Sequence, residues 1–135
     1  MLPLMTSPRV VAAVSAGVRR RISAILQGCE LRFVRAGSEL VRALDEARCD
    51  LMIVEVHFNE SSAAAALRCV LARDERFPVA CVREVPSERP GYAALGALRM
   101  AAGVGAQAFI DLLDYPDDEA GNAGARAVLK GLLET

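Results

Sequence analysis

The chain has 135 residues, which is enough for one continuous hydrophobic core and too few for two domains. Hydrophobic residues make up 53% of the chain and charged residues 24%, a composition that excludes an intrinsically disordered protein. The net charge of −1 gives no overall attraction to nucleic acid or to an anionic membrane, so a partner must be recognised through a local surface.

Apolar runs of strand length alternate along the chain with longer stretches of helical periodicity, a pattern typical of repeated strand–helix units around a parallel sheet. The first strand is expected at residues 9–15 and its helix at 18–27, where Gly28 supplies the signal that ends the helix. The second strand is expected at 30–35, and Ser38 is expected to N-cap the helix that follows it.

The alternation continues through the rest of the chain. Residues 51–56 are the most apolar run, and a strand that is apolar on both faces belongs at the centre of a sheet covered by helices on each side. Further elements are expected as a helix at 61–74, a strand at 79–82, a helix at 92–102, a strand at 107–112 and a helix at 119–133. The pattern therefore predicts five strand–helix units.

The segment around the third strand resembles a known family. The run Cys49-Asp50-Leu51-Met52-Ile53-Val54-Glu55-Val56 is similar to the third strand of the receiver domain of bacterial response regulators, in which an aspartate at the Glu55 position accepts phosphate. Residues 78–82 and 105–112 give further local matches. The resemblance implies an α/β fold of the flavodoxin-like type. This is a doubly wound (βα)5 three-layer sandwich with a parallel sheet in the order 2-1-3-4-5.

The same resemblance implies that the chain does not take phosphate. Receivers hold Mg²⁺ with an acidic pair after the first strand, and they hold the phosphate with a hydroxyl residue after the fourth strand and a lysine after the fifth. Here the acidic pair is replaced by Ser15 and Ala16, the hydroxyl residue by Arg83 and the lysine by Leu112. We therefore expect a degenerate receiver, or pseudo-receiver, that is not an enzyme and has no metal site and no cofactor.

Two interpretations of Glu55 stay open. Its side chain carries a negative charge one methylene further than aspartate would, so it can act as a constant mimic of the phosphorylated state. Alternatively, it is one polar residue at a solvated strand end without a function. An ion pair between Glu55 and Arg83 is also expected, because neighbouring strands lie about 5 Å apart.

The loop after the third strand contains the single histidine of the chain, His57. The run Glu55-x-His57-x-x-Glu60 weakly resembles the Asp-x-His-x-x-Gly run of cobalamin-binding domains, but the glycine is missing. A hydrogen-bonding surface histidine is therefore the favoured interpretation. Phe58 is an apolar residue among polar ones and so a candidate contact. The candidate residues at the edge of the site are Arg19, His57, Phe58 and Glu60.

The favoured hypothesis is a phosphorylation-independent protein–protein interaction module in bacterial signal transduction. Its expected surface, for a protein partner or for a homodimer, is formed by the helix at 92–102, the strand at 107–112 and the helix at 119–133, because the fifth strand is predicted at the edge of the sheet. The candidate contact residues are Tyr92, Arg99, Asp111, Asp114 and Tyr115.

The alternative hypothesis is a flavodoxin-like domain that binds a small ligand or an anion at the C-terminal edge of the sheet. Its candidate residues are Ser15, Arg19, His57 and Arg83. The size and the lining of a cavity at that edge separate the two hypotheses.

The remaining expectations concern cysteines, termini and location. The four cysteines are about evenly spaced without a Cys-x-x-Cys pair, so they predict small buried residues in a reducing compartment rather than a zinc site. Apolar runs are far shorter than a bilayer span, and residues 1–8 lack the pattern of a secretory signal. We therefore expect a cytoplasmic protein that binds neither membrane nor nucleic acid, with a tail at 1–8 and one domain at 9–135.

Overall fold

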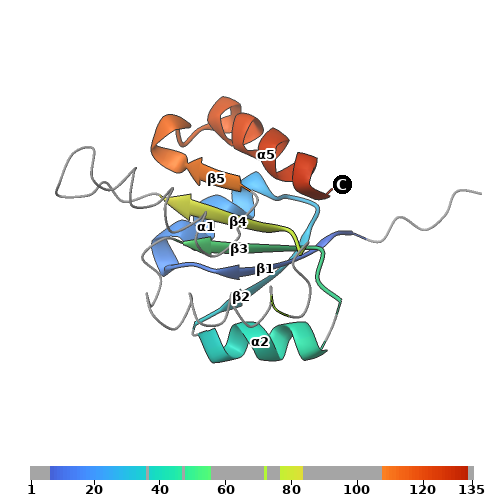
Figure 1. Cartoon of the computed structure of the whole chain (residues 1–135). Coiled ribbons are helices and arrows are strands. Elements are labelled where there is room, and N and C mark those ends of the chain that lie inside the picture. The colour runs from blue at the N-terminus through green and yellow to red at the C-terminus, as the bar shows by residue number, and fades with distance from the viewer. Residues whose placement is uncertain are drawn as a thin grey trace, which may run out of the picture.

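The computed structural model describes residues 7–35, 37–46, 48–55, 72, 77–83 and 108–133. Within these, five parallel strands form one sheet in the order β2-β1-β3-β4-β5 (Figure 1). The strands are β1 (Arg9–Ala13), β2 (Glu30–Val34), β3 (Leu51–Glu55), β4 (Val79–Arg83) and β5 (Ala108–Asp111). The predicted strand order 2-1-3-4-5 is confirmed.

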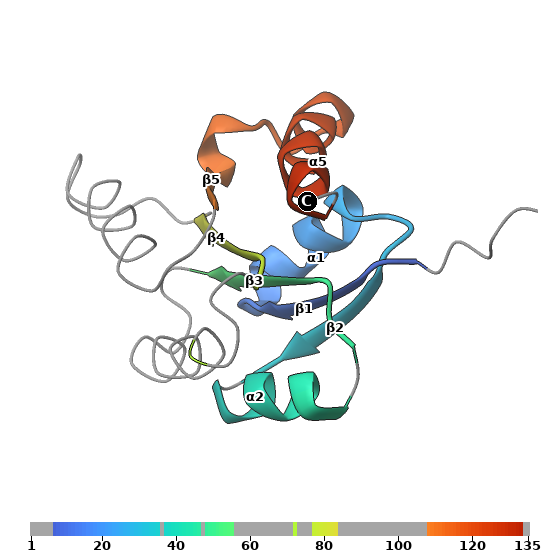
Figure 2. The same ribbon diagram turned by 45° about the vertical axis from the view of Figure 1, so that its right-hand side comes forward.

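Three α-helices of the described residues cover this sheet on its two faces. They are α1 (Ala16–Ile25), α2 (Gly37–Glu46) and α5 (Glu119–Leu133), and a short 3-10 helix, η1 (Leu112–Asp114), follows β5. Helices α1 and α5 lie on one face and α2 lies on the other, which gives the layers of a doubly wound sandwich (Figures 1 and 2). The predicted helices at 61–74 and 92–102 lie outside the described residues, except for Ala72, which is helical.

Several element ends differ from the sequence-based prediction. The helix predicted at 119–133 is confirmed at both ends, whereas α1 runs from Ala16 to Ile25 instead of 18–27. It starts early because Ser15 is an extended N-cap whose carbonyl oxygen accepts the first hydrogen bonds of the helix. The helix that Ser38 was predicted to cap already begins at Gly37, so that N-cap prediction is wrong. Gly28 was predicted to end the helix after residue 27, but the C-cap is Leu26, and Gly28 lies in the turn beyond it with a φ of 90°.

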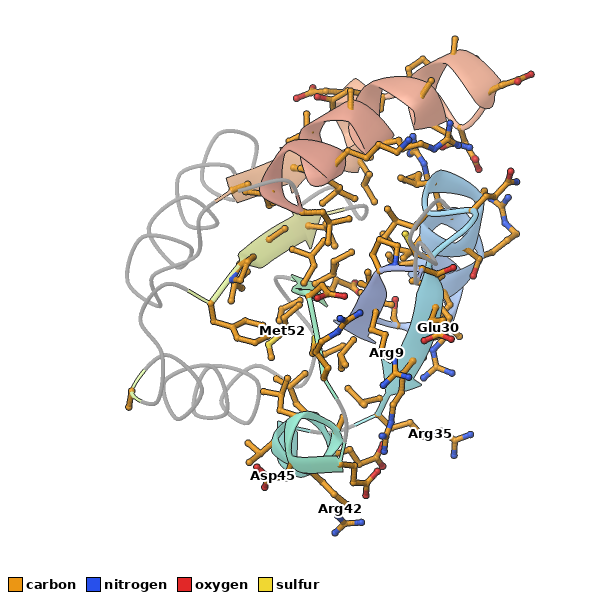
Figure 3. All side chains as sticks on the ribbon, turned by 90° about the vertical axis from the view of Figure 1, so that its right-hand side faces the viewer. Arg9, Glu30, Arg35, Arg42, Asp45 and Met52 are labelled. Atoms are coloured by element: carbon orange, nitrogen blue, oxygen red, sulfur yellow. The ribbon has the colours of Figure 1, made fainter. Side chains whose placement is uncertain are left out.

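The core has two parts, one on each face of the sheet. On the α1/α5 face, Leu51 and Ile53 of β3 pack with apolar residues of both helices, and on the α2 face Met52 and Val54 pack with Leu40. Figure 3 shows Met52 on the α2 side of the sheet. All five residues of β3 are buried, as expected for the central strand.

Candidate functional site

Glu55 is the last residue of β3 and is only 6% exposed. Its position in the strand places it on the α1/α5 face, the face to which Leu51 and Ile53 contribute. One carboxylate oxygen, Oε1, accepts a hydrogen bond from the backbone N–H of Ser15 at 2.6 Å. The interpretation of Glu55 as a solvated strand end is therefore wrong, because the carboxylate is buried and held by the turn between β1 and α1.

The turn after β1 offers that carboxylate a donor and no acidic neighbour. Ser15 and Ala16 stand where receivers carry their acidic pair, and both residues are exposed. The Ser15 side chain makes no capping hydrogen bond, while its backbone N–H binds Glu55 and its carbonyl oxygen begins α1. Since Mg²⁺ prefers oxygen ligands, a turn that contributes an N–H to the carboxylate is poorly suited to hold the ion.

The predicted ion pair between Glu55 and Arg83 stays a prediction. The register of the sheet pairs Glu55 with Val82, and it pairs Arg83 with Asp111. Adjacent positions of a strand face opposite sides of the sheet, so this one-residue offset argues against the ion pair. The side chain of Arg83 lies outside the described residues.

Leu112 stands at the receiver lysine position and is the first residue of η1, not the last residue of a strand as predicted. Its side chain is 1% exposed and packs into the core of the α1/α5 face. Its carbonyl oxygen accepts a hydrogen bond from the Arg21 guanidinium at 2.8 Å. This position therefore contributes an apolar group to the core and no cation to the site.

Arg21 of α1 is a functional candidate that the sequence-based prediction missed. It is 4% exposed, and its guanidinium donates to the carbonyl oxygens of Leu112, Tyr115 and Pro116 and to Oδ1 of Asn122. No carboxylate takes part in these hydrogen bonds. Arg21 lies at i+3 from Val18 and i−4 from Ile25, on the apolar stripe of the helix, and that spacing was the available signal for its burial.

The other two arginines of the 19–21 run also have partners within the protein. The Arg19 guanidinium lies 5.6 Å from the centre of the Phe33 ring, and its Nε–H donates to the Val14 carbonyl oxygen at 3.5 Å. Arg20 forms an exposed ion pair with Asp117. Two groups of the alternative ligand site, the Ser15 N–H and the Arg19 guanidinium, are thus already in use.

Three candidates for the partner surface fall within the described residues. Asp111 caps η1 through a hydrogen bond from the Leu113 N–H at 3.0 Å, Asp114 is exposed, and Tyr115 is half-buried against the core. The other two partner-surface candidates, Tyr92 and Arg99, lie outside the described residues, as do three candidates at the edge of the site: His57, Phe58 and Glu60. Of the three described candidates, Asp114 has the most exposed side chain.

The described cysteines are less uniform than predicted. Cys81 is buried, but Cys29 and Cys49 are half-buried, and Cys69 lies outside the described residues. Burial raises the pKa of all three described thiols, and it raises that of Cys81 to about 11. Within the described part of the chain, no three His, Cys, Asp or Glu residues gather where they could hold a metal ion. The described helices also include none long and apolar enough to span a membrane.

Comparison with known proteins bears on the fold. No family model and no curated protein matches the chain. Among solved structures, it is similar to the signal receiver domain of an HD domain-containing protein from Pseudomonas fluorescens Pf-5. The TM-score is 0.73 and the identity 14%, over 99% of this chain and 92% of that one. The chain has the fold of a receiver domain.

Two further structures share this receiver fold. A response regulator from Thermotoga maritima matches with a TM-score of 0.72 and 15% identity, over 96% of this chain and all of that one. The receiver domain of a sensor histidine kinase from Pseudomonas aeruginosa PAO1 matches with a TM-score of 0.70 and 15% identity, over 96% and 100% of the two chains. That last receiver has a magnesium ion coordinated in its active-site cleft.

Proposed function

We propose that this chain is a pseudo-receiver, a phosphorylation-independent interaction module that acts in bacterial signal transduction and is not an enzyme. The observation that carries the proposal is the hydrogen bond between Glu55 Oε1 and the Ser15 N–H at 2.6 Å. The carboxylate at the phosphoacceptor position is thus bound to a backbone N–H. That N–H belongs to the turn where receivers hold Mg²⁺.

Two further features support the loss of phosphate transfer. Phosphoryl transfer requires positive charge around the transferring oxygens, from a metal ion and from a cationic side chain. Ser15 and Ala16 provide no carboxylate for Mg²⁺, and Leu112 is buried in the core instead of presenting an ammonium group. A phosphoryl group on Glu55 would therefore be both hard to form and poorly stabilised.

The proposal is tested with acetyl phosphate and Mg²⁺, followed by intact-mass measurement. The wild-type chain is expected to gain no phosphoryl group. The variant Glu55→Asp is the informative companion, because it restores the acceptor and leaves the neutral turn and Leu112 unchanged, so it should also remain unlabelled. Stable, Mg²⁺-dependent labelling of the wild type would show that the chain is an active receiver.

The proposed module binds its protein partner, or a second copy of itself, through the surface around β5 and α5 together with the helix predicted at 92–102. In support, β5 lies at one end of the described sheet, where its outer backbone groups face no described strand. Two apolar side chains nearby are exposed, Leu113 at 46% and Val128 at 39%. Asp114 adds an exposed charge beside Leu113.

A further inference from the structure

A polar pocket of about 420 Å³ lies between α1 and the N-terminal part of α5, away from Glu55. Figure 2 shows these two helices side by side on the same face of the sheet. Helix α1 contributes Arg20, the turn before α5 contributes Asp117 and Asp118, and α5 itself contributes Glu119, Asn122 and Arg126. The lining thus carries charges of both signs.

The lining of this pocket includes a buried amide with an unused donor. Asn122 is 8% exposed, and its Oδ1 accepts a hydrogen bond from Nε of Arg21 at 3.3 Å. Because Arg21 is always a donor, the oxygen of the amide must face it, and the NH₂ group must face elsewhere. Among the described residues this NH₂ group has no acceptor. A buried donor without a partner is costly, so it favours a ligand that supplies an acceptor.

A second donor lies one helical turn further along α5. Arg126 donates from Nε to the Ile25 carbonyl oxygen at 2.5 Å and from Nη2 to the Ala24 carbonyl oxygen at 3.2 Å. Its remaining Nη1 has no acceptor in the described part of the chain. Asn122 and Arg126 are four residues apart and so lie on one face of the helix. Both residues line the same pocket, so each brings a donor to it.

The opposite end of the pocket is acidic. Glu119 is exposed without a described partner and lies three residues before Asn122, on the same face of α5. Asp118 uses Oδ1 to accept the Gly121 N–H at 2.8 Å and keeps its second oxygen for another donor. One face of the helix therefore changes from carboxylates to an amide and then to a guanidinium over two turns.

We propose that this pocket binds a free α-amino acid. The ligand carboxylate would accept from the Asn122 amide and from Arg126, and the ligand ammonium group would donate to Asp118 and Glu119. This pairing matches both signs of charge and gives the buried amide its missing acceptor. The proposal concerns a different site from Glu55 and does not depend on the absence of phosphate transfer.

The test is isothermal titration calorimetry of the full chain with a panel of free L-amino acids. Propanoate and ethylamine serve as half-ligands, since the first has only the carboxylate of an amino acid and the second only the ammonium group. At least one amino acid is expected to bind, and each half-ligand is expected to bind at least about tenfold more weakly, because each loses one charged set of hydrogen bonds. If no amino acid binds at millimolar concentration, or if propanoate binds equally well, the proposal is wrong.

Two variants locate the binding. Asn122→Asp keeps an oxygen for Arg21 but replaces the free donor with an acceptor, so binding should weaken by about tenfold or more. Glu119→Gln changes an exposed side chain with no described hydrogen bond or ion pair, and it should also weaken binding because it removes one of the two carboxylates. The control is Arg42→Gln on α2, whose side chain points away from the protein in Figure 3 and should leave binding unchanged. Wild-type affinity in both pocket variants would overturn the proposal, and Glu119→Gln decides it alone if Asn122→Asp does not fold.

Discussion

Arg21 of α1 and Arg126 of α5 extend in opposite directions across the boundary between their two helices. Arg21 donates to the Leu112 carbonyl oxygen, in the turn that leads to α5, and Arg126 donates to the Ile25 carbonyl oxygen at the end of α1. Carbonyl groups at the end of a helix, such as that of Ile25, lack partners within their own element, whereas the Leu112 carbonyl also accepts the Tyr115 N–H at 3.2 Å. The two guanidinium groups therefore hold α1 and α5 together in addition to the apolar contacts between them.

Replacing Arg21 with methionine is expected to lower the free energy of unfolding by about 3 kcal/mol, because it leaves Oδ1 of Asn122 and the Tyr115 carbonyl oxygen without a described donor. The Leu112 and Pro116 carbonyl oxygens keep the backbone N–H groups of Tyr115 and Asp118 as donors. The stability of Arg21→Lys should lie between that of the wild type and that of Arg21→Met, because an ammonium group cannot reach acceptors on as many sides as a guanidinium group. The measurement is urea unfolding at neutral pH. Arg20→Gln is the matched control on the preceding residue, where an exposed ion pair contributes at most about 0.5 kcal/mol. Equal losses at both positions would show that Arg21 has no special role.

Two glycines of α5 should respond to alanine in opposite ways. A Cβ atom on Gly121 would lie 1.8 Å from the Pro116 carbonyl oxygen, so Gly121→Ala should cost about 3 kcal/mol as the turn is pushed away. A Cβ atom on Gly131 meets nothing within 4 Å, so Gly131→Ala should stabilise the protein by about 0.5 to 1 kcal/mol through its higher helix propensity. Thermal unfolding of both variants checks this, and a stable Gly121→Ala protein would contradict the close packing of α5 on the turn.

The stability of the chain should fall in alkaline solution because of Cys81. Burial raises the pKa of this thiol from 9.0 to about 11, so between these values the unfolded chain loses the proton while the folded chain keeps it. The free energy of unfolding is therefore unaffected by this thiol below pH 9.0. It falls as the pH rises from 9.0 to about 11, by about 3 kcal/mol at most. Urea unfolding with a reductant across this range should show that stability falls as the pH rises. The fall should be shallower in Cys81→Ala, where only the smaller effects of Cys29 and Cys49 remain. An equally steep slope in that variant would assign the effect to other groups.

Charge reversal at Asp114 tests the proposed partner surface. Asp114→Lys changes an exposed side chain next to Leu113, so it should weaken any dimer or complex while the thermal midpoint stays nearly constant. Light scattering measures the assembly, and Arg99→Glu extends the test to the helix predicted at 92–102. Arg42→Glu on α2, on the other face of the sheet, is the control. A wild-type chain that stays monomeric at high concentration and a partner that tolerates both reversals would place the surface elsewhere.

The sequence by itself determined the positions of the strands and the absence of acidic and cationic groups at the receiver positions Ser15, Ala16 and Leu112. Apolar runs of strand length located the five described strands within one or two residues of their ends, because such a run is a local property of the chain. The family resemblance supplied the strand order. The neutral identities of Ser15, Ala16 and Leu112 can be read directly from the sequence, without any knowledge of their neighbours.

Only the tertiary structure showed which residues Glu55 and Arg21 contact. Glu55 and Ser15 are 40 residues apart, Arg21 and Leu112 are 91 apart, and Arg21 and Asn122 are 101 apart. Contacts over such separations depend on sheet register and on how helices pack, which the spacing of apolar residues along one segment does not specify. For this reason the spacing of Val18, Arg21 and Ile25 could indicate that Arg21 is buried, but it could not indicate that Arg21 links α1 to the turn before α5.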